Sequence, residues 1–147
     1  GGFAGTLLAF VPNEALASFR ANMEAVLGEG RCHVLSIRQA GGVAVLAHPH
    51  QLKLEAPELE ALLQQLISLG LQGIEAHYSR HTAEQTRLYL HLAEKYGLLV
   101  TSGSDFHGPS VKPDIQLGSG VAGSLCVEDG EIPRRLAQAI AANSALA

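Results

Sequence analysis

The sequence predicts an α/β fold in which parallel strands alternate with helices. Three short apolar segments, at 43–49, 71–78 and 98–105, are separated by segments whose apolar residues recur with a helical period. Strands that alternate with helices of about 10–15 residues are typical of parallel βα units. A chain of 147 residues that is 47% hydrophobic can form one core. We therefore expect one domain, or a piece of one.

The elements follow from local patterns. Residues 13–30 space their apolar side chains three and four positions apart, which predicts an amphipathic helix, and a short helix closed by glycine is expected over 34–42. Segment 43–49, VAVLAHP, is apolar and β-branched, as buried parallel strands are. The next helix, 56–70, has Pro57 in its first turn and a face formed by Leu59, Leu62, Leu63, Leu66 and Leu69.

The second half continues the alternation. Segment 71–78 is the second strand, and the helix after it begins with Thr82 and Gln85 in a capping-box arrangement. Segment 98–105 is the third strand. A connection rich in Gly, Ser and Pro then leads to a short strand over 125–129 and a last helix that starts at Pro133.

Charge and cysteine content limit the partners. A net charge of −4 provides no basic surface for duplex DNA, so small phosphorylated ligands are favoured. Cys32 and Cys126 are too few for a disulfide framework, which favours a reducing cytoplasm. The longest apolar run, GGVAVLA, is far shorter than the roughly 20 residues of a membrane span. We expect a soluble cytoplasmic protein.

Each of the three strands ends in histidine or acid. His48 ends the first, Glu75 and His77 lie in the second, and Asp105 and His107 follow the third. Because parallel neighbouring strands share one carboxyl edge, these groups can converge there. Imidazole and carboxylate together suit zinc, manganese or iron, whereas calcium prefers oxygen ligands. A metal site at this edge is therefore predicted.

Other interpretations of these residues stay open at this point. The segment SGSD before His107 also suits an Asx-turn. Glu75 can serve as a ligand, as an acceptor that orients a histidine, or as a partner of Arg80. Ser79 and His81 precede a capped helix, where a phosphate can meet backbone donors and an imidazolium. The HPH of His48 and His50 is itself an H-x-H, the pair that opens many metal-dependent hydrolase barrels.

Three segments together resemble the PHP (polymerase and histidinol phosphatase) family of metal-dependent phosphoesterases. They are GGVAVLAHP, GLQGIEAHYSRHTAEQTRLYLHLAEKYGLLVTSGSDFHG and KPDIQLG. The resemblance runs from about residue 37 to 136 and is greatest to the branch of nucleoside 3′,5′-bisphosphate phosphatases and 5′–3′ exoribonucleases. It implies that 37–147 form the C-terminal part of a distorted (β/α)7 barrel. Residues 1–36 match poorly and are expected to form a separate helical segment.

The resemblance also assigns roles. It implies that His48, Asp105 and His107 bind metal, that Asp105 helps to position a metal-activated water, and that His81 approaches the substrate phosphate. It also implies that Glu75 is a residue of the rim. From their positions in the sequence, Ser79 in the loop before the capped helix and Lys53 as a nearby cation are further candidates for binding that phosphate. The implied cofactors are divalent ions. Mn²⁺ is the first candidate, and Zn²⁺, Fe²⁺ or Mg²⁺ are the alternatives.

Two departures from the family affect the predicted function. Gln51 stands where relatives of this branch have an arginine, and the family's opening H-x-H pair is absent. The chain is therefore expected to be a partial family member that acts on phosphorylated nucleotides or short single-stranded RNA. Its uncovered strand edges predict self-association. The alternatives are a non-catalytic metal-binding fragment and a hydrolase of the amidohydrolase type.

Overall fold

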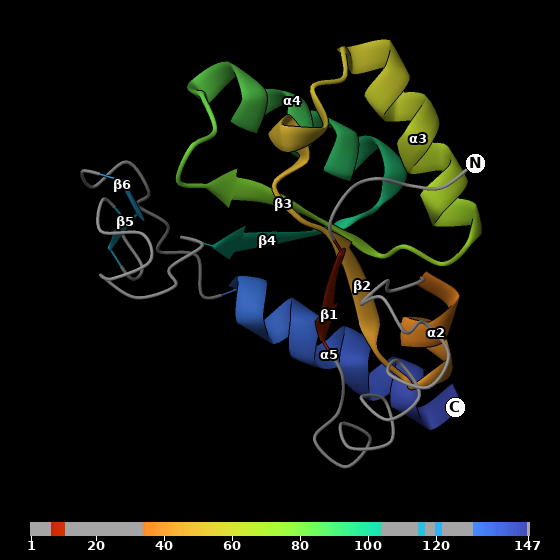
Figure 1. Ribbon diagram of the computed structural model, residues 1–147. Coiled ribbons are helices and arrows are strands. Elements are labelled where there is room, and N and C mark those ends of the chain that lie inside the picture. The colour runs from red at the N-terminus through yellow and green to blue at the C-terminus, as the bar shows by residue number, and fades with distance from the viewer. Residues whose placement is uncertain (1–6, 11–33, 104–114, 117–119, 122–130, 147) are drawn as a thin grey trace, which may run out of the picture.

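The computed structural model describes residues 7–10, 34–103, 115–116, 120–121 and 131–146. They contain a four-stranded sheet in the order β1 (Leu7–Phe10), β2 (Val43–Leu46), β3 (Gly73–Tyr78) and β4 (Leu99–Gly103). β2, β3 and β4 are parallel; α3 (Ala56–Ser68) connects β2 to β3, and α4 (Ala83–Tyr96) connects β3 to β4 (Figure 1). The predicted mixture of strands and helices in an α/β sheet is confirmed. Closure into a barrel stays a prediction.

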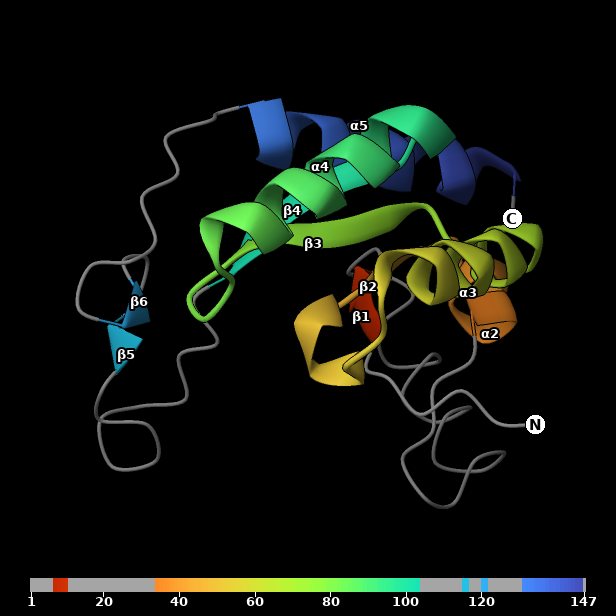
Figure 2. The ribbon, with the colours of Figure 1, turned by 90° about the horizontal axis from the view of Figure 1, so that it is seen from above.

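The core lies between the sheet and the helices α3 and α4. Alternate side chains of a strand point to one face, so Ala44 and Leu46 of β2 pack in one cluster with Ile74 of β3. Figures 1 and 2 show α3 and α4 on the same side of the sheet, with α4 alongside β3. The helices cover the cluster with Leu59, Leu63, Leu66, Tyr89, Leu92 and Ala93. Burial of a leucine contributes about 1.5–3 kcal/mol, so this layer holds the parallel strands in place.

The ends of α3 and α4 largely follow the sequence signals. Pro57 lies in the first turn of α3, and Gly70 follows the helix with a φ of 111°. The helix ends at Ser68, which leaves Leu69 beyond it and 47% exposed, so this leucine is not part of the predicted apolar face. The capping box of α4 is confirmed: the Thr82 side chain accepts from the Gln85 N–H, and the Gln85 side chain accepts from the Thr82 N–H.

The last helix, α5 (Glu131–Leu146), covers the other side of the sheet (Figure 1). Its buried Asn143 donates from Nδ2 to the carbonyl of Gly42, at 2.9 Å, and to Oε1 of Gln72, at 2.6 Å. A buried amide of this kind needs such partners, because an unpaired one costs about 1–3 kcal/mol. These two bonds fix α5 beside the amino-terminal ends of β2 and β3.

Some elements were not predicted. β1 pairs with β2 in antiparallel orientation, and a short 3-10 helix, η2 (Pro49–Leu52), follows β2. A two-stranded ladder joins β5 (Ile115–Gln116) to β6 (Gly120–Val121) within the segment expected to be a connection. Helix α2 (Val34–Gln39) is found as expected. The predicted helix at 13–30 and strand at 125–129 lie outside the described residues.

Among the described helices, none has both the length and the apolarity required to cross a bilayer.

Candidate functional site

His48 lies just beyond the carboxyl end of β2 with an uncommon backbone conformation. Its φ of 26° and ψ of 64° fall in the left-handed region, which residues other than glycine rarely adopt. The backbone N–H of His48 donates to Oε1 of Glu75 at 2.9 Å. Backbone strain of this kind costs about 1–3 kcal/mol and persists only where surrounding contacts maintain it. The hydrogen bond to Glu75 of β3 is such a contact, and it fixes the backbone position from which the His48 side chain extends.

The carboxylate of Glu75 lies between the ends of β2 and β4. Glu75 is 6% exposed although it is acidic, and besides the His48 N–H it closely approaches Gly103 at the end of β4. A Cβ atom on Gly103 would lie 2.5 Å from Oε2 of Glu75, closer than atoms can approach without a shift. Glycine at 103 thus leaves space for the carboxylate. Glu75 connects the end of β2 to the end of the strand that precedes Asp105.

A β-bulge in β3 helps to position His81. Glu75 pairs with Thr101, and His77 pairs with Ser102, so Ala76 is an extra residue relative to β4. The ring Nδ1 of His81 lies 2.8 Å from the Ala76 carbonyl. Because a carbonyl only accepts, Nδ1 carries the proton and Nε2 has a lone pair. Among the described residues, this buried Nε2 has no hydrogen-bond partner.

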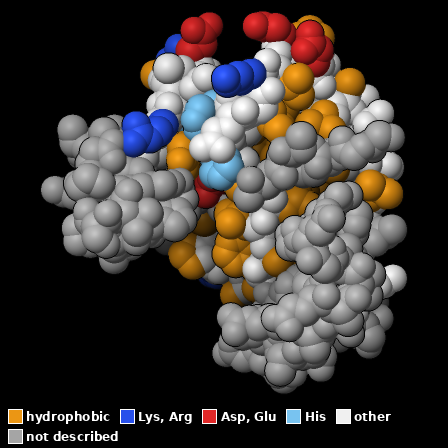
Figure 3. Space-filling model, viewed as in Figure 1, with side chains coloured by type: hydrophobic (Ala, Val, Ile, Leu, Met, Phe, Trp, Pro, Cys, Tyr) orange, Lys and Arg blue, Asp and Glu red, His pale blue; other side chains and the backbone are white. Residues whose placement is uncertain are grey.

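His50 and His81 belong to a continuous group of aromatic rings. The His50 ring centroid is 4.8 Å from that of His81 and 5.2 Å from that of Tyr78, and the His48 centroid is 5.4 Å from that of Tyr78. The ring of Tyr89 in α4 is 4.8 Å from His81. Histidine side chains come to the surface together on the face shown in Figure 3, with basic side chains nearby. The cluster spans the space from β2 to α4.

Burial keeps the side chains of His50, His81 and Tyr89 uncharged at neutral pH. Desolvation lowers the pKa of His81 to about 4, although its bond to Ala76 acts in the opposite direction. Desolvation, with the nearby charges of His48 and Arg80, also lowers the pKa of His50. Desolvation raises the pKa of the Tyr89 hydroxyl to about 12. At neutral pH both histidines are therefore neutral, and Tyr89 keeps its proton.

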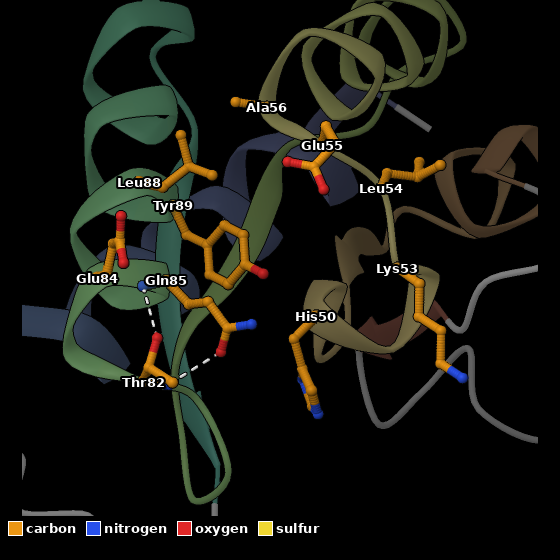
Figure 4. A pocket seen from close by; sticks show the side chains of 10 residues that line it. All are labelled: His50, Lys53, Leu54, Glu55, Ala56, Thr82, Glu84, Gln85, Leu88 and Tyr89. Atoms are coloured by element: carbon orange, nitrogen blue, oxygen red, sulfur yellow. Dashed lines mark hydrogen bonds between the residues drawn. The ribbon is translucent and has the colours of Figure 1, made fainter.

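A cavity of about 750 Å³ opens beside this cluster. The segment 50–56 forms one wall, and residues 82–89 at the start of α4 form the other. Figure 4 shows Gln85 and the hydroxyl end of Tyr89 reaching into the space from α4, with Glu55 on the opposite wall. Its volume is within the range of about 300–1,000 Å³ that is usual for small-molecule sites.

The structure places only some of the predicted site residues. His48 and His81 lie near one another through their shared contacts with His50 and Tyr78, and Ser79 is buried in the turn before α4. Lys53 lines the cavity, but its side chain turns away from α4 (Figure 4). Asp105 and His107 lie outside the described residues. Their metal-binding roles stay predictions.

The described residues contain no group of three or more side chains that can bind a metal. One ring N–H of His81 donates to a carbonyl, as in many metal-binding histidines, and its other nitrogen is buried. His48 lies at the carboxyl edge, where a ligand is expected. The donor chemistry in this part of the chain therefore fits a divalent ion that receives further ligands from elsewhere.

Sequence reasoning offered His50 only the H-x-H interpretation and found no role for Tyr89. Both lie in the aromatic cluster and line the cavity. For Tyr89 a signal was available, since it is three residues before Leu92 on the buried face of α4. For His50 no local pattern predicts the contact, because the 3-10 helix after β2 brings its ring toward the turn before α4.

The lowered pKa of the half-buried His81 predicts a loss of stability in mild acid. Its pKa is about 4 in the folded chain and about 6.5 when unfolded, so between these values the unfolded state binds more protons. The free energy of unfolding should therefore fall as the pH is lowered from 6.5 to 4. Urea unfolding at several pH values measures this, and His81→Gln should show a weaker decrease. An equal decrease in both proteins would contradict the assignment.

No family model matches the sequence. Three curated relatives are similar to part of it. They are a 3′,5′-nucleoside bisphosphate phosphatase of Chromobacterium violaceum (37% identity over 70 residues), a phosphoribosyl 1,2-cyclic phosphate 1,2-diphosphodiesterase of Eggerthella lenta (40% over 80) and a 5′–3′ exoribonuclease of Haemophilus influenzae (30% over 74). The matches cover 48%, 54% and 50% of this chain, but only 25%, 29% and 27% of the relatives. The chain thus spans between a quarter and a third of their length.

Two solved structures share the fold. One is an amidohydrolase from Chromobacterium violaceum with bound sulfate and no metal, with a TM-score of 0.56 and 31% identity over 72% of this chain and 35% of that one. The other, from Bifidobacterium adolescentis, is described as a metal-dependent phosphoesterase, with a TM-score of 0.56 and 27% identity over 82% and 44%. Together with the curated relatives, these neighbours support a PHP-like phosphoesterase family for the matched part of the chain.

Proposed function

We propose that the chain carries the C-terminal part of the active site of a metal-dependent phosphoesterase. Its substrates are phosphate esters of nucleotides or short oligoribonucleotides. The observation that supports this most directly is the histidine cluster at the carboxyl ends of β2 and β3, where His48 and His81 both contact the rings of neighbouring residues. The names of the three curated relatives agree with an ester of a ribose phosphate as substrate.

Each residue has a distinct part in this proposal. His48, Asp105 and His107 would hold a divalent ion, for which Mn²⁺ is the first candidate. Such an ion supplies charge stabilisation for the phosphate oxygens and an acidified water. Glu75 fixes the backbone of His48 through its N–H. An anionic phosphate beside His81 Nε2 would favour the imidazolium and raise the pKa of this ring, so that Nε2 donates to the phosphate.

The position of His50 argues against the H-x-H interpretation of HPH. β2 ends at Leu46, and His50 lies in the 3-10 helix η2, so His48 and His50 do not project from consecutive outward positions of one strand. Their ring centroids are 6.4 Å apart and nearly perpendicular. An amidohydrolase reaction remains the second candidate, because one structural neighbour has that name. Amide hydrolysis that is lost in His50→Ala would favour it.

Phosphate release from adenosine 3′,5′-bisphosphate tests the proposal. We expect release by the wild-type chain with Mn²⁺, and a decrease of at least about 100-fold in Asp105→Ala, because loss of a ligand should cost no less than loss of its supporting residues. His91→Ala is the matched control, since His91 is exposed in α4 outside the ring cluster. Metal binding without any phosphate release would contradict the reaction and favour a non-catalytic metal-binding role.

A further inference from the structure

The cavity beside the histidine cluster has walls whose chemistry differs from that of the cluster. It lies between residues 50–56 and the first two turns of α4, and His50 is shared between the cavity and the cluster. His50 lines the cavity, and its ring centroid is 4.8 Å from that of His81, so a ligand in this space is separated from His81 by one ring. The cavity therefore adjoins the place where the proposed function puts the phosphate.

The charges of the lining disfavour a second phosphate. Glu55 and Glu84 both line the cavity, whereas Lys53, a cation of the same wall, turns its side chain away from α4 (Figure 4). An anion placed here would meet the carboxylates of this lining, while the cation of the same wall points elsewhere. An uncharged ligand fits better.

The polar groups that reach into the cavity are complementary to hydroxyl groups. The carboxylate of Glu55 only accepts hydrogen bonds. On the opposite wall, Gln85 uses its carbonyl oxygen to accept from the Thr82 N–H, at 2.9 Å, which leaves its NH₂ group to donate. Tyr89 adds a hydroxyl that stays protonated (Figure 4). A sugar hydroxyl can donate to the carboxylate and accept from the other wall, as ribose does at an acidic residue in dinucleotide sites.

We propose that this cavity binds the free 2′-hydroxyl of the substrate's ribose, on the leaving-group side of the phosphate ester. Glu55 accepts a hydrogen bond from this hydroxyl, while Gln85 and Tyr89 donate to it. Leu54, Ala56 and Leu88 provide apolar surface beside these groups, which suits the carbon face of a sugar or a base. The proposal depends on the proposed function only for the phosphate that would adjoin the ribose.

Calorimetric titration of the full chain with adenosine and with 2′,3′-dideoxyadenosine, both without metal, tests this subsite. We expect adenosine to bind at least about tenfold more tightly than 2′,3′-dideoxyadenosine, because hydrogen bonds to a charged group are stronger than those between neutral groups. Glu55→Gln should remove this preference. Glu55 is exposed and makes no capping bond to α3, so this change should not disturb the fold. Glu58→Gln, in the first turn of the same helix and outside the cavity, should keep the preference.

The outcomes separate this proposal from the phosphoesterase reaction. Equal binding of the two nucleosides, no binding of adenosine, or a preference that survives in Glu55→Gln would each overturn the subsite. If Mn²⁺-dependent phosphate release is present but adenosine does not bind, only the subsite is wrong. If adenosine binds with the expected preference but no phosphate is released, the subsite stands and the reaction is wrong.

Discussion

Replacement of Gly103 by alanine is expected to lower the free energy of unfolding by about 1–3 kcal/mol, the usual cost of forcing extra volume into a packed site. The new Cβ would lie 2.5 Å from Oε2 of Glu75. The end of a side chain moves more readily than a strand, so the carboxylate should shift and weaken its bond to the His48 N–H. Urea unfolding measures the change. Ser102→Ala, an exposed position on the same strand, is the control and should stay within about 0.5 kcal/mol.

A double-mutant cycle tests whether Glu75 is the cause. Glu75→Ala alone should cost about 1–3 kcal/mol, because it leaves the His48 N–H without this acceptor. In the Glu75→Ala background the added methyl of Gly103→Ala no longer meets a carboxylate. The decrease in the free energy of unfolding that Gly103→Ala causes should therefore nearly vanish. The expected coupling is therefore about 1 kcal/mol or more. If the decreases in the free energy of unfolding of the two single variants simply add in the double variant, Glu75 does not link the ends of β2 and β4.

The sequence signals for the layers of the fold were strong because they depend on local periodicity. The apolar run 43–46 forms the fully buried strand β2, and leucines spaced three and four apart form the buried face of α3. Thr82 and Gln85 form the capping box that their spacing indicates. β1 could not be predicted in the same way, since its pairing with β2 joins residues more than 30 positions apart.

The candidate site was predictable only in outline. Histidine and acid at strand ends indicated the carboxyl edge, and His48 lies there. Glu75 accepts from the backbone N–H of His48, which is 27 residues away. The bulge at Ala76, whose carbonyl accepts from His81, depends on register between β3 and β4. Such contacts arise from packing between distant segments, and no local pattern encodes them.

His48 is expected to bind a divalent ion together with residues that follow β4. Loss of either ligand should weaken Mn²⁺ binding by at least about tenfold, as loss of one contributor to a metal site usually does. Asp105→Ala and His48→Ala should therefore have similar effects on affinity. This is the spatial claim on which the phosphoesterase proposal depends, because these residues are more than 50 positions apart in the sequence.

The most direct test follows the ring proton signals of His48 by NMR while Mn²⁺ is added to the full chain. We expect the first equivalent of this paramagnetic ion to broaden the His48 signals in the wild type, with the exposed His91 still sharp. In Asp105→Ala the same concentration should leave His48 sharp. Sharp His48 signals in the presence of bound Mn²⁺, or broadening that is unchanged in Asp105→Ala, would contradict a shared metal site at the ends of these strands.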